Sequence, residues 1–350
     1  MTRSSRDGAG WEEGWGEMSV SRREFIRVAA VGVAGAAWAS SLTGCSSKTL
    51  APRMGLGNLF MEGEKPLLVV VEGTDLSKML EAGLDALGGL GRLVEGKKLV
   101  LKPNVVASQP PPVTTDVEMT RMLAEFARRD GAGSITVCDA NSSGVGKAGK
   151  FEALGFPARL KEAGIPLDAV DFGDRMAHVF VTNDKWRAHP TIGVVRTLYE
   201  ADAIINLPMV KRHGASRFTC ALKNHFGSVY GPLRFVAHRK LSSSEDGKVF
   251  FDQALAEFAD AVRPELNVVD GRSLLARRGP TLEGGSEIKK VNRIVLCGDM
   301  LATDVYCARL MEEHDDSFSM DMISVQLETA ERLGLGTGDL SNVVIKEITV

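Results

Sequence analysis

The side chains best suited to chemistry crowd into one stretch of this chain, between Asp202 and Gly227. An apolar run over residues 203–207 leads directly into a group of cationic and hydrogen-bonding residues. The members of this group are Lys211, Arg212, His213, Ser216, Arg217, Thr219, Lys223, Asn224 and His225. A buried strand that ends in a polar loop and then a helix is how α/β proteins build anion sites. The stretch therefore predicts a site for a phosphate or a carboxylate.

The spacing within this stretch predicts a helix over residues 215–226. Such a helix has an apolar face and an opposite, polar face that holds Ser216, Thr219 and Lys223. The free amides at its start would favour an anion. A solvated helix face is the alternative explanation of the same pattern.

Polar residues also follow the other apolar, strand-like runs of the chain. They are Lys102 and Asn104, Asp139 and Asn141, Asp270, and Asp299. Ligands bind outside the carboxyl ends of parallel strands, so we expect these side chains to meet Lys211 and His213 at one sheet edge. For any one of them the alternative is an ordinary turn, because Asp, Asn and Gly are common turn formers.

These residue types suggest a division of roles within the site. His213 is the candidate general acid and base, because imidazole exchanges protons near neutral pH. Lys211 and Asp270 are the further catalytic candidates. The candidate ligand-binding residues are Lys102, Asn104, Thr219, Lys223 and Asn224. One of the lysines could instead act as a covalent nucleophile, although no feature of the sequence selects it.

A divalent metal is a further possibility at this site. His213, Asp270 and Asp304 could form a carboxylate–imidazole metal site, although no HxH or HExxH spacing supports it. Histidines that only form hydrogen bonds are the alternative. The cysteines after Cys45 lack CxxC spacing, so neither a zinc site nor an iron–sulfur cluster is predicted. We expect these cysteines to be buried free thiols rather than disulfides.

The composition is that of an ordinary globular protein of 350 residues, of which 44% are hydrophobic and 25% are charged. The formal net charge of −3 gives no global basic field, so we expect no nucleic-acid partner. The positive charge near residues 211–223 is therefore a local feature, and the expected partner there is a small anionic ligand.

The first part of the chain predicts an export signal. Arg22 and Arg23 precede an uncharged run over residues 28–42, a pattern typical of a twin-arginine signal. As a helix this run would span roughly 22 Å, less than the ~30 Å of a bilayer core. The sequence LTGC at 42–45 resembles a lipoprotein cleavage site, at which Cys45 would be lipidated. Ordinary cleavage and an uncleaved anchor are the alternatives.

These features set the expected domain plan and location. Residues 1–45 would be the signal, 46–64 a tether and 65–350 the folded domain. Met18 is a candidate true start, because the residues before it include acidic side chains that a signal peptide avoids. The expected partners are the twin-arginine translocase during export and the membrane through lipidated Cys45. The protein would be anchored at the extracytoplasmic face of a bacterial membrane.

Strand-like and helix-like segments alternate from residue 67 to residue 348. This alternation predicts an α/β fold with an open, mostly parallel sheet and helices on both faces. The irregular segments 172–196 and 228–248 could connect two lobes, and residues 343–348 are a candidate edge strand.

Several short blocks follow one another in an informative order. They are KPN at 102–104, TTD at 114–116, NLP at 206–208, KRH at 211–213, LKN at 222–224, FG at 226–227, VDG at 269–271, and the R-x-x-x-H pair Arg234 and His238. In this combination the chain resembles the DUF362 family from about residue 98 to residue 338. The resemblance implies an α/β fold and a site at these blocks, without a particular reaction.

The chain departs from the pattern of that family at several positions. Val117 replaces a usual proline, Arg212 a threonine and Cys220 a glycine. Residues 275–280, LARRGP, lack the acidic residue that similar sequences often carry there, and ferredoxin-like cysteine modules are absent. The leading hypothesis is an exported, membrane-anchored enzyme with a cleft for a small anionic substrate. The alternative is a non-catalytic protein that binds a ligand, metal or cofactor.

Overall fold

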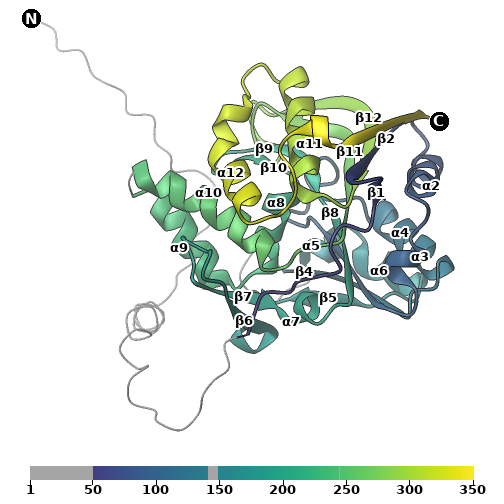
Figure 1. The fold of residues 1–350 in the computed structure, drawn as a ribbon, viewed down its shortest axis with the longest axis horizontal. Helices are drawn as coiled ribbons and strands as arrows, with labels where there is room; N and C mark the ends of the chain where they lie inside the picture. Colours follow the sequence, from purple (N-terminus) through teal and green to yellow (C-terminus); the bar gives the residue numbers. More distant parts are fainter. Residues whose placement is uncertain (1–49, 141–148, 244) are drawn as a thin grey trace, which may run out of the picture. The chain divides into compact units, whose positions relative to one another are not determined.

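A central, mostly parallel β-sheet organises the computed structural model, which describes residues 50–140, 149–243 and 245–350 (Figure 1). In spatial order its strands are β1 (Met61–Glu62), β2 (Lys65–Glu72), β12 (Glu287–Cys297), β11 (Leu266–Ala276), β8 (Ala203–Leu207), β3 (Lys98–Pro103), β4 (Ser134–Ala140) and β5 (Leu167–Val170). Strand β13 (Val344–Thr349) pairs with β2, and β9 (Met209–His213) joins β11 and forms a hairpin with β10 (Arg217–Thr219). A separate two-stranded sheet contains β6 (His178–Thr182) and β7 (Thr191–Val195).

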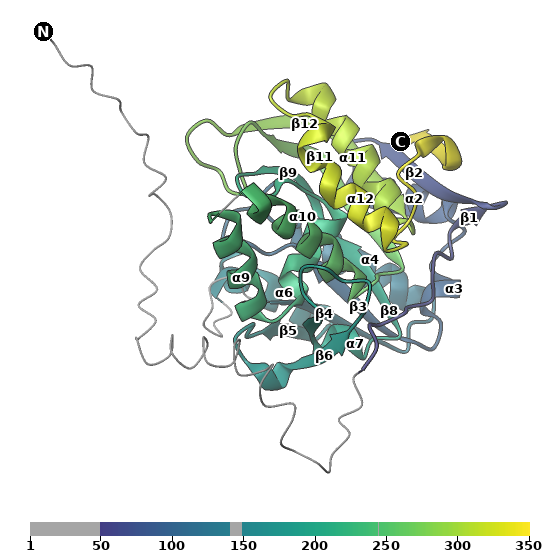
Figure 2. The same ribbon diagram turned by 60° about the vertical axis from the view of Figure 1, so that its left-hand side comes forward.

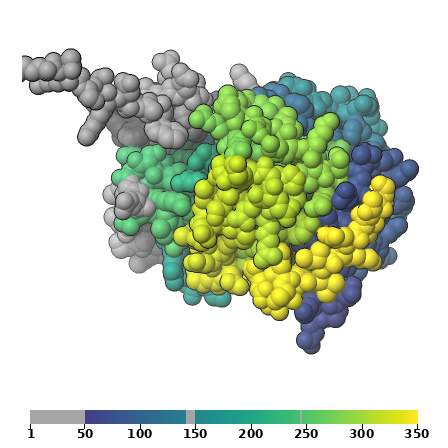
Figure 3. All heavy atoms as spheres, turned by 90° about the horizontal axis from the view of Figure 1, so that it is seen from above, coloured from purple at the N-terminus to yellow at the C-terminus, as the bar shows by residue number. Residues whose placement is uncertain are grey.

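The strand directions confirm the predicted α/β fold. Strands β11, β8, β3, β4 and β5 run parallel to one another, whereas β12 is antiparallel to both β11 and β2. The expected edge strand is also present, since β13 pairs in parallel with β2. In the space-filling view, the yellow C-terminal segment accordingly lies against the purple segment near the start of the domain (Figure 3).

Helices cover both faces of the sheet, as Figure 2 shows from a second direction. The helices that contribute to one apolar core are α2 (Leu76–Ala86), α3 (Gly91–Val94), α4 (Val117–Arg129), α5 (Gly149–Ala153) and α6 (Phe156–Glu162). The helices that contribute to the other core are α7 (Arg196–Tyr199), α8 (Ala221–Asn224), α9 (Gly231–Leu241), α10 (Glu245–Asp260), α11 (Met300–His314) and α12 (Ser324–Arg332). The short 3₁₀ turns are η1 (Arg175–Ala177), η2 (His225–Ser228), η3 (Met320–Ile323) and η4 (Leu340–Asn342).

The unbroken apolar runs of the sequence follow from this two-sided burial. In β2, Leu68 and Val70 pack into one core, whereas Val69 and Val71 pack into the other. A strand that is covered on both faces needs apolar residues at every position, because successive side chains point to opposite faces. The same burial explains why polar and apolar residues do not alternate along these strands.

The order of the strands creates one crossover point near the middle of the sheet. After β3 the chain adds β4 and β5 toward one edge, and it then returns to place β8 on the opposite side of β3. Loops that leave neighbouring strands in opposite directions open a crevice between them, where α/β proteins bind ligands. The carboxyl ends of β3 and β8 are therefore the place to look for a site.

The segment that the sequence analysis treats as a tether is packed into the domain from residue 50 onward. Leu50 forms a bridge with Val181, and Phe60 is fully buried. The guanidinium of Arg53 lies 2.8 Å from the carboxylate of Glu265. The residues expected to form the signal peptide, including Met18 and Cys45, lie outside the described part of the chain.

Residues 49–350 form one compact unit, so the two-lobe possibility is not supported. The segment 172–196 contains the β6–β7 hairpin, and the segment 228–248 contains α9. Neither segment leads to a second lobe. Within the described residues, the helices are all too short or too polar to cross a membrane.

Candidate functional site

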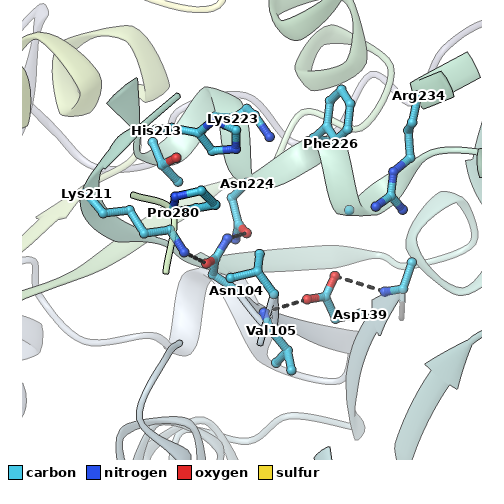
Figure 4. A pocket seen from close by; sticks show the side chains of 14 residues that line it. Asn104, Val105, Asp139, Lys211, His213, Lys223, Asn224, Phe226, Arg234 and Pro280 are labelled. Carbon is cyan, nitrogen blue, oxygen red and sulfur yellow. Dashed lines mark hydrogen bonds between the residues drawn. The ribbon is translucent and has the colours of Figure 1, made fainter. Parts of the chain in front are cut away.

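A small cavity opens at the crossover point, beyond the carboxyl ends of β3 and β4 (Figure 4). Its volume is about 50 Å³, enough for a few waters or a small oxyanion, since one water needs about 10–15 Å³. The predicted site residues that line it are Asn104, Lys211, His213, Thr219, Lys223 and Asn224. The structure thus brings together residues that lie more than a hundred positions apart in the sequence.

Asp139 lines the cavity and forms a buried ion pair with Lys102. The Nζ atom of Lys102 is 2.7 Å from Asp139 Oδ1, and it also donates to the carbonyl of Pro103 at 3.0 Å. Burial raises the pKa of Asp139, and the charge of Lys102 opposes this shift. A side chain at Gly227 would place its Cβ only 2.7 Å from Asp139 Oδ1, so glycine leaves room for the pair. Lys102, a predicted ligand-binding residue, therefore neutralises Asp139 instead of contacting the cavity.

Lys211 is fully buried, and neutral groups accept its hydrogen bonds. Its Nζ donates to Asn104 Oδ1 at 2.7 Å and to the carbonyl of Val113 at 2.6 Å. Burial lowers the pKa of Lys211 to about 7, and the nearby charge of Asp139 opposes part of that shift. Near neutral pH the amine therefore exists in both its charged and its neutral form.

A chain of buried amides fixes the position of Asn104. Asn104 donates to Asn224 at 2.7 Å, Asn224 donates to Asn206 at 2.7 Å, and Asn206 donates to Asn267 at 2.9 Å. Asn267 donates in turn to the carbonyl of Cys297 at 3.1 Å. Because each amide donates to the next, Asn104 is left with its oxygen facing Lys211. Asn206 and Asn267 are not among the site residues predicted from the sequence. An amide inside an otherwise apolar strand could have identified them, because a buried polar group needs a hydrogen-bond partner.

The predicted helix over residues 215–226 is wrong. Residues 217–219 form β10, which pairs with β9 so that Thr219 faces Lys211 and Arg217 faces His213. Phe218 points the other way and stacks on Phe318, with ring centroids 5.4 Å apart. This alternation is that of a strand, and the hairpin bonds outweigh the helical spacing of the apolar residues. The helix begins only after Cys220, as the short α8.

The start of α8 does not offer its amides to a ligand. The amides of Ala221 and Leu222 donate to the carboxylate of Asp304, at 2.6 Å and 3.3 Å. Burial raises the pKa of Asp304 to about 7, although these hydrogen bonds oppose the shift. Asp304 therefore joins α11 to α8 and lies outside the set of residues that line the cavity.

Among the described residues, two polar atoms in the cavity wall are buried without a hydrogen-bond partner. They are Thr219 Oγ1 and Arg234 Nη1. The guanidinium of Arg234 reaches toward the cavity from α9 and lies over the ring of Phe172, 4.5 Å from its centroid (Figure 4). Burial lowers the pKa of Arg234 to about 10, and the charge of Asp139 opposes the shift. Buried polar atoms are normally paired, so these two point to a missing acceptor.

Lys223 lies in the same wall without a hydrogen bond or ion pair to any described residue. Its Nζ sits 4.0 Å from the ring centroid of Phe226, and only 9% of the residue is exposed. Burial lowers the pKa of Lys223 well below its ordinary value, and the positive charges of Arg234, Lys211 and Lys102 lower it further.

The ring of His213 is held in one tautomer by its own loop. Its Nδ1 accepts hydrogen bonds from the amides of Ala215 and Ser216, at 3.1 Å and 3.3 Å. The proton of the neutral ring is therefore on Nε2. Burial, followed by the charges of Lys223 and His238, holds the pKa of His213 well below its ordinary value. At neutral pH this histidine can donate a hydrogen bond, but its Nδ1 is not free to act as a base.

The structure does not bring together the proposed metal ligands His213, Asp270 and Asp304. Asp270 is bound by Arg272, whose Nε and Nη2 lie 2.9 Å and 2.8 Å from its carboxylate oxygens. Arg272 also pairs with Asp116 at 2.7 Å, so Asp270 belongs to a separate ion-pair network. Among the described residues, no cluster of three or more His, Cys, Asp or Glu side chains is placed to hold a metal ion.

Another polar residue predicted at a strand end, Asp299, also does not lie at the cavity. Asp299 lies at the opposite edge of the sheet, because it follows β12, which runs antiparallel to its neighbours. There its carboxylate caps α11 by accepting a hydrogen bond from the amide of Ala302 at 2.8 Å. Asn141 falls outside the described residues. The cysteines Cys138, Cys220, Cys297 and Cys307 are free and buried.

Arg234 is a further residue of the site to which no role was assigned from the sequence. It lies after the polar stretch, on α9, and only the fold returns it to the cavity. Its place in the R-x-x-x-H element was the signal that could have identified it.

The comparison with known proteins covers most of the domain. Residues 99–309 match the model of DUF362, a domain of unknown function. A thylakoid-associated protein of Synechocystis sp. is 28% identical over 268 residues, which cover 75% of this chain and 77% of that protein.

Two solved structures were found to be similar to part of the chain. The lactate racemase apoprotein of Thermoanaerobacterium thermosaccharolyticum is 11% identical with a TM-score of 0.46, over 71% of this chain and 58% of that chain. A protein of Thermotoga maritima is 14% identical with a TM-score of 0.38, over 73% of this chain and 57% of that chain. The present chain thus spans less than two thirds of each of them. Because the family model matches more than half of its residues, the chain belongs to the DUF362 family.

Proposed function

We propose that the cavity binds a small oxyanion, a phosphate or a carboxylate, and that the protein is an enzyme acting on a small anionic substrate. The observation that carries this proposal is the pair of unpartnered buried donors, Arg234 Nη1 and Thr219 Oγ1. A hydroxyl and a guanidinium that face one small cavity match the acceptor-rich edge of an oxyanion.

The charge of the cavity supports the same ligand class. Lys211, Lys223 and Arg234 line it, and the pKa of each is lowered by burial. Asp139, which supplies negative charge there, is already paired with Lys102. An anion would relieve the unfavourable burial of these cations, because an opposite charge favours their protonated forms.

The alternative is a binding protein without turnover, and one observation favours it. Two backbone amides occupy Nδ1 of His213, so the predicted general base is not free in this structure. An enzyme would convert a bound substrate to product, whereas a binding protein would not. Both functions require the anion site.

We further propose that residues 1–45 direct export by the twin-arginine route and that lipidated Cys45 anchors the protein at the extracytoplasmic membrane face. The sequence pattern supports this location, as does the thylakoid association of the Synechocystis relative. Cys45→Ser should move the protein from the membrane fraction to the soluble fraction. Its retention in the membrane fraction would contradict lipid anchoring.

The anion site can be tested by titration calorimetry with inorganic phosphate and with acetate. We expect Arg234→Gln to weaken binding roughly 10- to 150-fold, because a hydrogen bond to a charged group contributes about 1.5–3 kcal/mol. The matched control is Arg239→Gln, since Arg239 lies on the same helix but is exposed. Equal affinity in the wild type and Arg234→Gln, or no binding of either anion, would overturn the proposal.

A further inference from the structure

We propose that Lys223 is a covalent nucleophile, which forms an imine with the carbonyl of a short oxo acid whose carboxylate is held by Arg234. This inference rests on the proposed anion site, and it names the substrate class and the first chemical step. The sequence left open which lysine could be the nucleophile, and the contacts of the three lysines now separate them.

Lys102 and Lys211 both have their amines occupied. Lys102 is bound to the carboxylate of Asp139 at 2.7 Å. Lys211 donates to two oxygens at 2.7 Å and 2.6 Å, so its Nζ is already engaged in two hydrogen bonds. Lys223 has no such contact with a described residue, yet it is more than nine-tenths buried and lines the cavity.

The surroundings of Lys223 favour the neutral amine that nucleophilic attack requires. Burial lowers the pKa of Lys223 well below its ordinary value, and the charges of Arg234, Lys211 and Lys102 act in the same direction. Desolvation and a neighbouring cation are two devices by which enzymes activate a lysine. Both are present here, because Lys223 is buried and Arg234 borders the ring of Phe226, over which Nζ of Lys223 lies.

The positions of the two groups define the substrate. Lys223 Nζ and Arg234 Cζ lie 4.0 Å and 5.3 Å from the ring centroid of Phe226. Both residues line the same cavity, so a carboxylate bound by Arg234 would leave the carbonyl of the same short molecule inside the cavity that Lys223 also lines. The unpartnered hydroxyl of Thr219 is available to donate to the carbonyl oxygen. A cavity of about 50 Å³ suits the carboxylate and carbonyl end of a short oxo acid.

The step needs no oxidant and no further reactant. The lone pair of Nζ attacks the carbonyl carbon, and the carbonyl oxygen leaves as water after taking up the two protons that the nitrogen loses. The carbon–oxygen double bond is thus replaced by a carbon–nitrogen double bond. The imine then withdraws electrons from the neighbouring carbon, which is how lysine enzymes prepare oxo acids for bond cleavage or proton exchange.

Reductive trapping tests the inference directly. The purified full-length protein is incubated with pyruvate or with levulinate in the presence of cyanoborohydride, whose hydride converts an imine to a stable secondary amine. Peptide mass spectrometry then locates the adduct. We expect labelling of Lys223 to be at least tenfold faster than labelling of the exposed Lys78, and to be lost in Lys223→Met but kept in Lys78→Met.

The controls separate this inference from the anion site itself. Acetate, which has a carboxylate but no reactive carbonyl, should slow labelling of Lys223 and leave labelling of Lys78 unchanged. If acetate binds in the calorimeter but Lys223 is labelled no faster than Lys78, the imine is overturned and the anion site stands. If acetate and phosphate do not bind and Lys223 is not labelled, both proposals are overturned. The wild-type labelling pattern decides the matter even if Lys223→Met fails to fold.

Discussion

Thr219 illustrates how a single residue can be placed for a ligand instead of for stability. Its hydroxyl is buried at the end of β10 and has no hydrogen-bond partner in the part of the chain that the structure describes, although the residue is only 2% exposed. Burying an unpaired hydroxyl costs free energy, so the folded protein gains nothing from this group until a ligand accepts its hydrogen bond.

We therefore expect Thr219→Val to leave the free energy of unfolding unchanged or higher while it weakens anion binding roughly 10- to 150-fold, because the lost hydrogen bond is to a charged group. Urea denaturation and calorimetry measure the two quantities on the same samples. The control is Thr303→Val, because the buried hydroxyl of Thr303 donates to the carbonyl of Asp299. That variant should lose about 1 kcal/mol of stability and keep its affinity. A Thr219→Val protein with normal affinity would contradict the assigned role.

Lys211 should make the stability of the domain depend on pH. Its pKa is about 7 in the folded protein, against about 10.4 in an unfolded chain. Between these values the unfolded state holds a proton that the folded state lacks, so the free energy of unfolding rises with pH by up to about 1.4 kcal/mol per unit. Below pH 7 this contribution is flat, because both states are protonated.

We expect Lys211→Met to reduce the rise in unfolding free energy between pH 7 and 10, as measured by urea denaturation in a buffer without phosphate. Met cannot take up a proton, so the contribution of this position disappears whatever the absolute stability of the variant. Lys78→Met, which alters an exposed lysine, should keep the wild-type slope. An identical slope in the wild type and Lys211→Met would show that the amine is not deprotonated in the folded protein.

At the scale of elements, the amide chain ties the site to the middle of the sheet. It runs from Asn104 after β3, through Asn224 in α8, to Asn206 in β8 and Asn267 in β11. Each of these hydrogen bonds joins two different elements, so the row of amides connects α8 to the three strands. A fully paired buried network of this kind orients its members more sharply than apolar packing does.

We expect Asn206→Leu to lower the free energy of unfolding by about 1–3 kcal/mol, because it leaves the buried oxygen of Asn267 without a donor. Adding Asn267→Leu should cost less than the sum of the two single changes, since neither partner of this bond then remains. Urea denaturation of the double-mutant cycle measures the difference. Asn342→Leu, at an exposed position, should change stability by less than about 0.5 kcal/mol. Strict additivity in the cycle would contradict the network.

At the scale of the whole molecule, Arg53 fixes the beginning of the described chain to the domain. Its guanidinium donates to Glu265 at 2.8 Å and to the carbonyls of Ala201 and Arg263, at 3.1 Å and 2.7 Å. Glu265 also accepts from the amide of Ile204 in β8, so one buried pair connects the N-terminal segment to the central sheet. An anchor upstream of residue 50 would thus be followed almost at once by the folded domain.

We expect Arg53→Met to destabilise the protein by about 3–5 kcal/mol, because Glu265 would keep a buried charge without its partner. Arg53→Met combined with Glu265→Gln should recover part of that loss. The control is Arg293→Met, whose ion pair with Glu72 is exposed and contributes about 0–1 kcal/mol. Thermal or urea denaturation ranks the stability of the three variants. Equal losses of stability in Arg53→Met and Arg293→Met would contradict the stabilising role of the Arg53–Glu265 pair.

The fold class and the neighbourhood of the site could be predicted from the sequence because both depend on local order. Apolar runs such as Leu67–Val71 identify strands that are buried on both sides, and their alternation with helices implies a parallel sheet. Polar residues directly after such strands then mark one edge. In the structure, Asn104 and Lys211, which follow two such strands, both line one cavity.

The rest depends on contacts between distant residues. The helical spacing of Phe218 and Leu222 gave way to the hairpin of β9 and β10, and the antiparallel direction of β12 sent Asp299 to the opposite edge.

By itself, then, the sequence determined an α/β sheet and a cationic stretch after β8, because strand periodicity and residue charge are local properties. Only the tertiary structure decided which charges are already paired, since Lys102 meets Asp139 and Asp304 meets the amides of α8 through long-range packing. The same packing brought Arg234 into the cavity and left Lys223 without a hydrogen bond or ion pair to a described residue. A free donor is defined by what surrounds it, and those surroundings come from segments that the sequence keeps far apart.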